Sequence, residues 1–228
     1  MKILFTIILS IVIGLSSYSQ NQVGANIGYG ISYYNIKQYN NNIQLTYTPK
    51  SAYEIEINYK KRWPGLLNFG TSVSFQNQKL KVNSIYKDSK NNFDKSVDYK
   101  LNNIYIKAFP EFIFGNKIRY YVQIGPSLSI MTSSESDGYL DITGIAGNEP
   151  ITVHNIITGD ASTIFNTFSF GFFGGLGIDI PLSDNFTISA SSQLDYSINS
   201  WFNKENDIYS SRALIFRIGA NYIIREVK

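Results

Sequence analysis

The chain reads FSFGFFGGLGIDIP from residue 168 to residue 181. The even positions hold bulky apolar residues, apart from a glycine at 174, and most odd positions hold Ser, Gly or Asp. Successive side chains of a β-strand point to opposite faces. The stretch therefore predicts a strand with one apolar face and one polar, crowded face.

The same alternation recurs about eight times along the chain, as expected for the strands of a small barrel. The predicted strands are 23–34, 43–61, 66–80, 99–114, 117–132, 163–181, 186–201 and 208–225. The connections after the second, fourth and sixth strands are tight, and the others are longer and polar. This predicts an all-β fold, a closed antiparallel up-and-down transmembrane β-barrel with short periplasmic turns and longer outer loops.

Two places leave the strand count open. Pro49 interrupts the second predicted strand and predicts a bend or bulge. Residues 81–98 are polar and are expected to form one outer loop. Residues 133–162 form the longest predicted connection. This connection and the bend at Pro49 leave room for one extra hairpin.

Residues 1–19 resemble a secretory signal peptide. Lys2 precedes an apolar run over 3–15, and Ser17-Tyr18-Ser19 has the small-x-small pattern of a cleavage site. The alternative is a membrane anchor, but the run is shorter than the roughly 20 residues that a spanning helix needs. We expect a cleaved leader followed by a single barrel domain over 20–228, located in the outer membrane of a Gram-negative cell.

Composition excludes several kinds of site. The 228 residues include no Cys and one His, so disulfides, thiolate chemistry and a polyhistidine metal site within one chain are excluded. The net charge of +3 is small and is not gathered on one stretch, which argues against a nucleic-acid partner. No metal and no cofactor is predicted.

One segment carries a family resemblance. Residues 105–112 lead through Gly115-Asn116 to the aromatic run 120–126, which ends in Gly-Pro, and residues 174–182 add a Gly-rich strand with a polar turn. Together with a cleavage site before Gln20, these stretches resemble the outer-membrane β-barrel domain family common in Bacteroidetes, small porin-like barrels that include PorT-like members.

The resemblance implies a fold and a compartment. It implies no catalytic or binding residue, because its motifs are structural. It implies assembly by the barrel insertion machinery, with Tyr222 as the aromatic nearest the end, although the chain ends Glu226-Val227-Lys228 rather than at an aromatic. PorT-like members make a role in protein secretion conceivable by analogy of fold.

Charged residues recur on the polar phase of the predicted strands. Side chains fill the interior of a barrel of about eight strands, so charges there must pair. We expect a structural network of lumen charges, with a proton or small-ion path as the alternative. Its predicted members are Glu54, Glu56, Lys107, Glu111, Arg119, Asp179, Asp195 and Arg217.

Aromatic residues stand near the predicted strand ends. Membrane barrels carry aromatic girdles at both interfaces, although an aromatic-rich chain also places rings there by chance. The predicted interface aromatics are Trp63, Trp201, Tyr33 and Tyr209.

His154 is the only candidate base for an enzyme, and it lies in the longest predicted loop. A Ser–His site needs a contacting nucleophile and an orienting third group, and no nucleophile motif points at His154. We therefore predict no catalytic residue and a non-enzymatic barrel that acts through its loops or periplasmic face.

Its expected partners are outer-membrane lipid and glycolipid, the insertion machinery and an envelope protein. The lysines around 79–95 are balanced by Asp88, Asp94 and Asp98, which favours a solvated loop over an anion site, and contact with glycolipid phosphates is the alternative. The alternatives are a narrow channel, a lipid A-modifying enzyme and a soluble lipocalin-like ligand carrier, in which the apolar phase would face inward.

Overall fold

A computed structural model describes residues 20–36, 43–63, 66–87, 91–115, 117–146, 149–165, 167–198 and 209–224. The expected signal peptide and Trp201 lie outside these residues. The strands are β1 (Gln20–Ile36), β2 (Ile43–Arg62), β3 (Leu67–Lys87), β4 (Asn91–Phe114), β5 (Arg119–Ala146), β6 (Glu149–Asp160), β7 (Phe168–Pro181), β8 (Phe186–Ser197) and β9 (Tyr209–Ile224).

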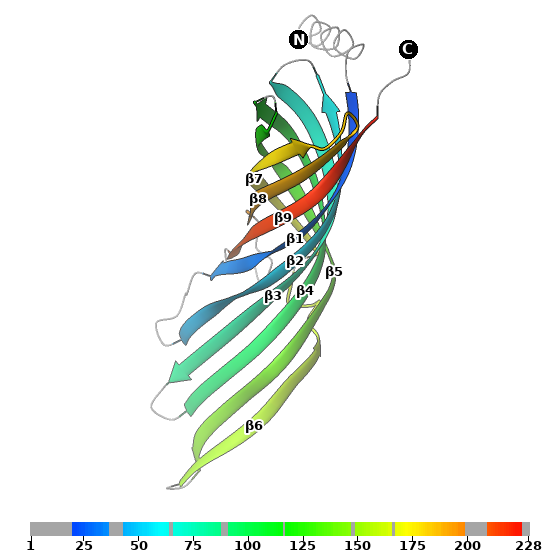
Figure 1. Ribbon diagram of the computed structural model, residues 1–228. Helices are drawn as coiled ribbons and strands as arrows, with labels where there is room; N and C mark the ends of the chain where they lie inside the picture. Colours follow the sequence, from blue (N-terminus) through cyan, green and yellow to red (C-terminus); the bar gives the residue numbers. More distant parts are fainter. Residues whose placement is uncertain are drawn as a thin grey trace, which may run out of the picture.

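Eight of these strands form a closed ring. Neighbours pair antiparallel in the order β1, β2, β3, β4, β5, β7, β8 and β9, and β9 returns to pair with β1 (Figure 1). The ninth strand, β6, pairs with the far half of β5. The predicted closed antiparallel barrel of about eight strands is confirmed, and the extra hairpin is β5–β6.

The two ends of the barrel differ. Tight connections at 63–66, 115–118 and 182–185 meet at one end, here called the turn end, where β1 starts and β9 finishes. Gly115 has a φ of +89°, a conformation that favours glycine in a tight turn. At the other end, β3, β4, β5 and β6 continue beyond β7 and β8 as a curved sheet, here called the ribbon (Figure 1).

The ribbon corrects two predicted loops. Residues 81–87 belong to β3, 91–98 to β4, and most of 133–162 to β5 and β6. Cross-strand pairs hold the β3–β4 part, including Tyr86 against Phe93, with ring centroids 5.6 Å apart, and the hydrogen bond from Ser96 to Asn83. Each face of this part mixes polar and apolar residues, so a pattern that searches for one apolar face misses it.

The faces of the barrel wall are divided as the alternation predicts. Ile106, Phe170 and Phe216 are 41%, 57% and 62% exposed on the outer surface, whereas Lys107 is 1% exposed on the inner surface. The apolar outer positions of β4 span 104–114, which matches the roughly 9–11 residues of a tilted spanning strand. None of the helical segments among the described residues has the length and hydropathy of a membrane span.

Two bulges change the phase of single strands. The β2–β3 register shifts between Pro49 and Ala52, which agrees with the bend predicted at Pro49. The β4–β5 register shifts where Asn102 pairs with Ser133 but Asn103 pairs with Met131. As a result Met131 and Ser134 of β5 both face the interior, although their spacing is odd.

Candidate functional site

The middle of the barrel interior holds a cluster of paired charges. Lys107 of β4 donates to Glu54 of β2 at 3.0 Å and lies 3.4 Å from Asp195 of β8. Arg217 of β9 contacts the other oxygen of Glu54 through Nε at 2.7 Å and Nη2 at 2.6 Å, and Glu56 through Nη1 at 3.3 Å. Glu54 thus bridges two cations, and the cluster links four strands of the ring.

A second cluster lies nearer the turn end. Arg62 donates to Asp179 at 2.7 Å, and Lys60 is paired with Glu111. The ammonium of Lys60 also stands 4.7 Å from the centre of the Tyr121 ring. All four charged groups are buried, and a buried charge is tolerated when it is paired and hydrogen-bonded.

Side-chain amides complete the middle cluster. Gln193 donates to Asp195 at 2.6 Å, Gln76 donates to the same carboxylate at 3.3 Å, and Arg217 donates to Gln193. Gln123 donates to Gln193 at 3.5 Å. These amides form hydrogen bonds with carboxylate oxygens of Asp195 and an N–H group of Arg217, in addition to the ion pairs.

The structure brings seven of the eight predicted lumen charges into the buried interior: Glu54, Glu56, Lys107, Glu111, Asp179, Asp195 and Arg217. Arg119 differs, because it starts β5 at the rim opposite Asp179 and is only half-buried. Sequence reasoning missed Lys60 and Arg62, although both continue the even phase of Glu54 and Glu56 along β2.

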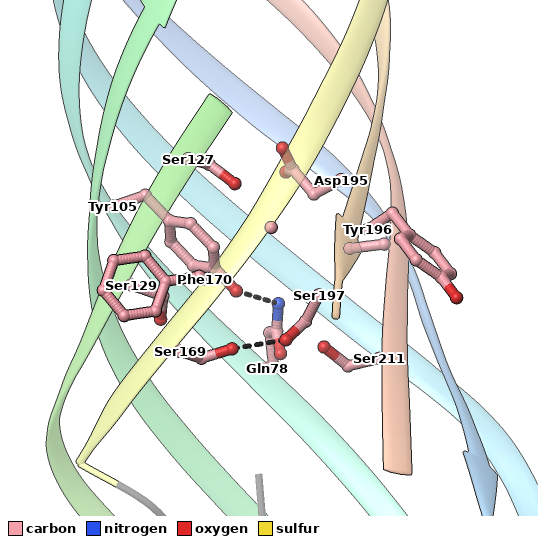
Figure 2. Close-up of a pocket in the computed structure, with 12 residues that line it drawn as sticks. Gln78, Tyr105, Ser127, Ser129, Ser169, Phe170, Asp195, Tyr196, Ser197 and Ser211 are labelled. Carbon is pink, nitrogen blue, oxygen red and sulfur yellow. Dashed lines mark hydrogen bonds between the residues drawn. The ribbon is translucent and has the colours of Figure 1, made fainter. Parts of the chain in front are cut away.

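Two small voids lie beside the middle cluster among the described residues. One, on the ribbon side, has a volume of about 10 Å³ and is lined by Gln78, Tyr105 and several serines (Figure 2). There Gln78 donates to the Tyr105 hydroxyl at 3.3 Å, and Ser169 is hydrogen-bonded to Ser197. A second void of about 10 Å³ lies on the turn side, beside Lys60 and Arg217. Each is about large enough for one water.

The ribbon end of the interior is apolar, contrary to the polar lumen predicted throughout. Buried side chains of β3, β4 and β5 pack there with Ala161 and Phe165, which come from the segment after β6. The ring of Phe165 stands edge-on to Tyr99, with centroids 5.2 Å apart. The other members of this apolar plug are Leu80, Val97, Leu101, Tyr105 and Met131.

The plug segment is fastened at both ends. Ala161 donates its backbone N–H to Ser134, and Thr167 accepts from the N–H of Met131 at 2.8 Å. Asp160 accepts from the N–H and the hydroxyl of Ser162, and these two hydrogen bonds lower the pKa of the Asp160 carboxyl. Phe165 is therefore held over the charged interior by a short, anchored segment.

The predicted interface aromatics lie at different ends. Trp63 follows β2 at the turn end, where its ring packs edge-on against Phe69 at 5.2 Å. Tyr33 is exposed on the part of β1 nearer the ribbon end. Tyr209 begins β9, but its side chain lies outside the described residues, as does all of Trp201.

His154 lies on β6, not in a loop. Its Nδ1 contacts the carboxylate of Asp141 on β5, and its ring stacks on Tyr139 with centroids 5.7 Å apart. Within the described part of the chain, no hydroxyl is hydrogen-bonded to His154, and no three acidic or His side chains gather as metal ligands. The pair supplies an oriented base without a nucleophile.

The match to a family model agrees with this architecture. The family model described as "Outer membrane protein beta-barrel domain" matches residues 18–203. No curated protein gives a significant match.

Several solved structures are similar to the chain, among them the outer membrane protein OprG. OprG from Pseudomonas aeruginosa is 11% identical, with a TM-score of 0.49 over 91% of this chain and 98% of that chain. Neisserial surface protein A is 14% identical, with a TM-score of 0.45 over 89% and 96%. The attachment invasion locus protein Ail of Yersinia pestis is 13% identical, with a TM-score of 0.42 over 90% and 99%.

Proposed function

Since the chain belongs to the outer membrane protein beta-barrel domain family, we propose that it is an integral, non-enzymatic outer-membrane protein that binds a partner in the cell envelope. In this placement the turn end faces the periplasm and the ribbon projects from the cell. The leader over 1–19 would direct export, and the insertion machinery would assemble the barrel. A part in secretion, which the PorT-like resemblance implies, is one form of this partner role.

The filled interior is the observation that carries the proposal. The Glu54 cluster crosses the ring between β2, β4, β8 and β9, and the voids beside it have room for about one water each. A solute path would require these buried pairs to separate, and breaking a buried pair costs about 3–5 kcal/mol. The interior therefore serves as a polar core, and binding is left to the outer surfaces.

The ribbon is the surface best suited to a partner. It presents exposed apolar side chains, Ile151, Val153 and Ile156 of β6, on a projection that the barrel itself does not need in order to close. Ile151 and Val153 lie on one face of β6 and Ile156 lies on the other. Exposed apolar residues grouped on one face, as Ile151 and Val153 are, typically mark an interaction site. Trp63 would stand at the periplasmic interface of the outer membrane, and Tyr33 would stand at its outer interface.

The test separates the barrel from its partner surface. In one variant a two-residue Asn-Gly turn replaces 141–154, which closes the hairpin at the Leu140–Asn155 pair. The matched control replaces 85–94 in the same way and closes the β3–β4 hairpin at Ser84–Lys95. Both variants should stay in the outer-membrane fraction and keep a heat-dependent gel shift.

Cross-linking in intact envelopes should give an adduct with the wild type and the control, and lose it in the 141–154 variant. Planar bilayers should show no stepwise conductance with any of the three proteins. An adduct that survives in the 141–154 variant contradicts a partner site on the ribbon tip, and stepwise conductance contradicts the filled interior.

A further inference from the structure

The outer surface of β3, β4 and β5 changes character in successive cross-strand rows. Phe75, Ile104 and Ile130 form an apolar row. In the next row toward the ribbon, Asn77 donates to Asn102 at 2.6 Å and Asn102 donates to Ser133 at 2.8 Å. This polar row ends the apolar belt, because hydrocarbon offers no partners for such groups.

The row directly beyond this boundary is charged. Lys79 faces Lys100, and Lys100 faces Glu135. Lys79 stands between buried Gln78 and Leu80, so its side chain projects outward, from the same surface that carries the apolar belt. In the proposed orientation this is the level of the lipid headgroups in the outer leaflet.

The charged row borders a hollow of about 580 Å³. The charged side chains that line it are Lys50, Lys79, Lys100, Asp98, Glu135 and Asp137. The hollow is far larger than the water-sized voids of the interior, and its position gives access to a headgroup.

The two ion pairs among these charges leave one cation, Lys79, and one anion, Asp137, without an ion-pair partner among the described residues. Lys50 lies 3.8 Å from Asp98, and Lys100 lies 3.2 Å from Glu135. Lys79 makes no ion pair within the described residues, yet it faces Lys100 directly across the strands. Like charges in that position are destabilising, and an anion between the two ammonium groups would remove the repulsion.

We propose that Lys79 and Lys100, with Lys50 beside them, form a binding site for the phosphorylated headgroup of an outer-leaflet glycolipid. A lysine binds phosphate as a point charge, and each lysine near an anionic membrane surface adds to the attraction. The inference rests on the proposed outer-membrane placement and goes beyond it, because it assigns a ligand to one side of the wall.

The carboxylates of the hollow fit the same ligand. Asp98 and Asp137 face each other across β4 and β5. Mg²⁺ is commonly held by one or two carboxylates together with phosphate oxygens, so a Mg²⁺ carried by the headgroup would neutralise this second like-charge pair. Binding of the glycolipid should therefore be stronger with Mg²⁺ than with a chelator.

The experiment uses the full-length protein in detergent and bisphosphorylated lipid A as the probe. Native mass spectrometry gives the affinity for lipid A, for its fully dephosphorylated form and for inorganic phosphate. The test variant is Lys79→Gln with Lys100→Gln. The matched control is Lys61→Gln with Lys117→Gln, which removes two lysines at the turn end. The heat-dependent gel shift of each variant checks folding.

We expect the wild type to prefer bisphosphorylated lipid A, and the test variant to bind it about 30-fold more weakly. The control should bind like the wild type, and chelation should weaken wild-type binding. Equal affinity for the dephosphorylated form, or an equal loss in both double variants, overturns the site. Displacement of lipid A by inorganic phosphate at similar concentration shows a free-anion site instead and overturns the lipid assignment.

Failure here is separable from failure of the proposed function. The hollow does not include residues 141–154, so the shortened ribbon should still bind lipid A. A protein that fractionates outside the outer membrane contradicts the placement itself, before any lipid is added.

Discussion

At the scale of single residues, Glu54 has the most demanding position in the molecule. Its two carboxylate oxygens serve Lys107 and Arg217, and neither cation has access to solvent. The same cations have Asp195 and Glu56 as further partners. Pairing around Glu54 therefore decides whether the interior is a stable core or a set of uncompensated charges.

Replacing Glu54 by Gln should destabilise the barrel by about 3–5 kcal/mol, because it leaves a buried positive charge without its carboxylate. The free energy of unfolding can be measured by urea titration in lipid vesicles. Glu135→Gln is the control, since Glu135 forms an exposed pair with Lys100, and exposed pairs contribute about 0–1 kcal/mol. Equal losses in the two variants would mean that the interior cluster is not the core of the fold.

Residue alternation predicts a side chain's face but not its partner. It placed Glu54, Lys107 and Arg217 on one face, since each follows the two-residue period. It could not pair them, because the three strands are far apart in sequence and their stagger is unknown beforehand. The amides Gln76, Gln123 and Gln193 share the same phase, but the predicted network contains charged residues alone, because uncharged polar groups look ordinary in a polar lumen.

At the scale of elements, the stretches 105–112 and 120–126 of the family resemblance, which contain Pro110 and Pro126, lie opposite each other. The β4–β5 pairs stop at Lys107–Ser127 and resume at Glu111–Gln123. Pro110 and Pro126 lie in this gap, where neither could donate to the ladder. Phe109 turns inward and packs edge-on against Phe173 of β7, with centroids 5.6 Å apart. The motif is thus a local break in the β4–β5 ladder beside this buried pair of rings.

Gly125 should be essential to this break. A Cβ at Gly125 would collide with the carbonyl oxygen of Ala108, whereas a Cβ at Gly174, in the neighbouring strand, would meet nothing within 4 Å. Gly125→Ala should cost about 1–3 kcal/mol through forced backbone movement, and Gly174→Ala should be close to neutral. Urea unfolding of the two variants checks this, and equal stabilities would contradict the close approach of β4 and β5.

The ribbon shows why strand ends were the weakest part of the sequence prediction. Within the bilayer one face must be apolar, so Phe168 to Ile180 can be recognised from its period alone. Outside it, β3 and β5 continue as hydrogen-bonded strands in which each face mixes polar and apolar residues, and residues such as those of 81–87 resemble a loop. The tight turns were easier, because Trp63-Pro64-Gly65 and Gly115-Asn116 carry their own turn chemistry.

The segment that holds Phe165 was not predictable, because nothing local distinguishes it from an ordinary loop. Phe165→Ala should loosen it, since deleting a buried Phe side chain costs about 3–5 kcal/mol. Hydrogen exchange of the 161–167 amides should accelerate more than exchange of the β2 amides around Glu54. Conductance should stay absent, because the charged cluster still fills the barrel below. Opening of a channel in this variant would make the plug, not the ion pairs, the barrier.

At the scale of the whole molecule, polar and apolar side chains are separated in two ways. They lie on opposite sides of the barrel wall, and this arrangement changes along the barrel axis. Charges and amides occupy the inside of the barrel's middle, and an apolar belt covers its outside. Beyond the Asn77–Asn102–Ser133 row the order changes, because the interior becomes apolar at Phe165 and the outside becomes charged at Lys79 and Lys100. A water-soluble ligand carrier would need an apolar interior along the barrel itself, which the Glu54 cluster rules out.

This arrangement predicts which exposed side chains contact lipid and which contact water, a difference that the exposed fraction alone does not show. Nitroxide labels at 106, 170 and 216 replace exposed apolar residues of the belt, and a label at 156 replaces Ile156, which is 74% exposed but lies on the ribbon. In lipid bilayers the first three labels should be relaxed by dissolved oxygen and shielded from a water-soluble nickel chelate. The label at 156 should show the reverse, because the charged row at Lys79 and Lys100 separates it from the hydrocarbon.

If the three belt labels responded to the nickel chelate, the bilayer would not surround the barrel where the polar row places its edge. If the label at 156 behaved like them, the ribbon would lie in lipid, and the proposed partner surface and headgroup site would both lose their position.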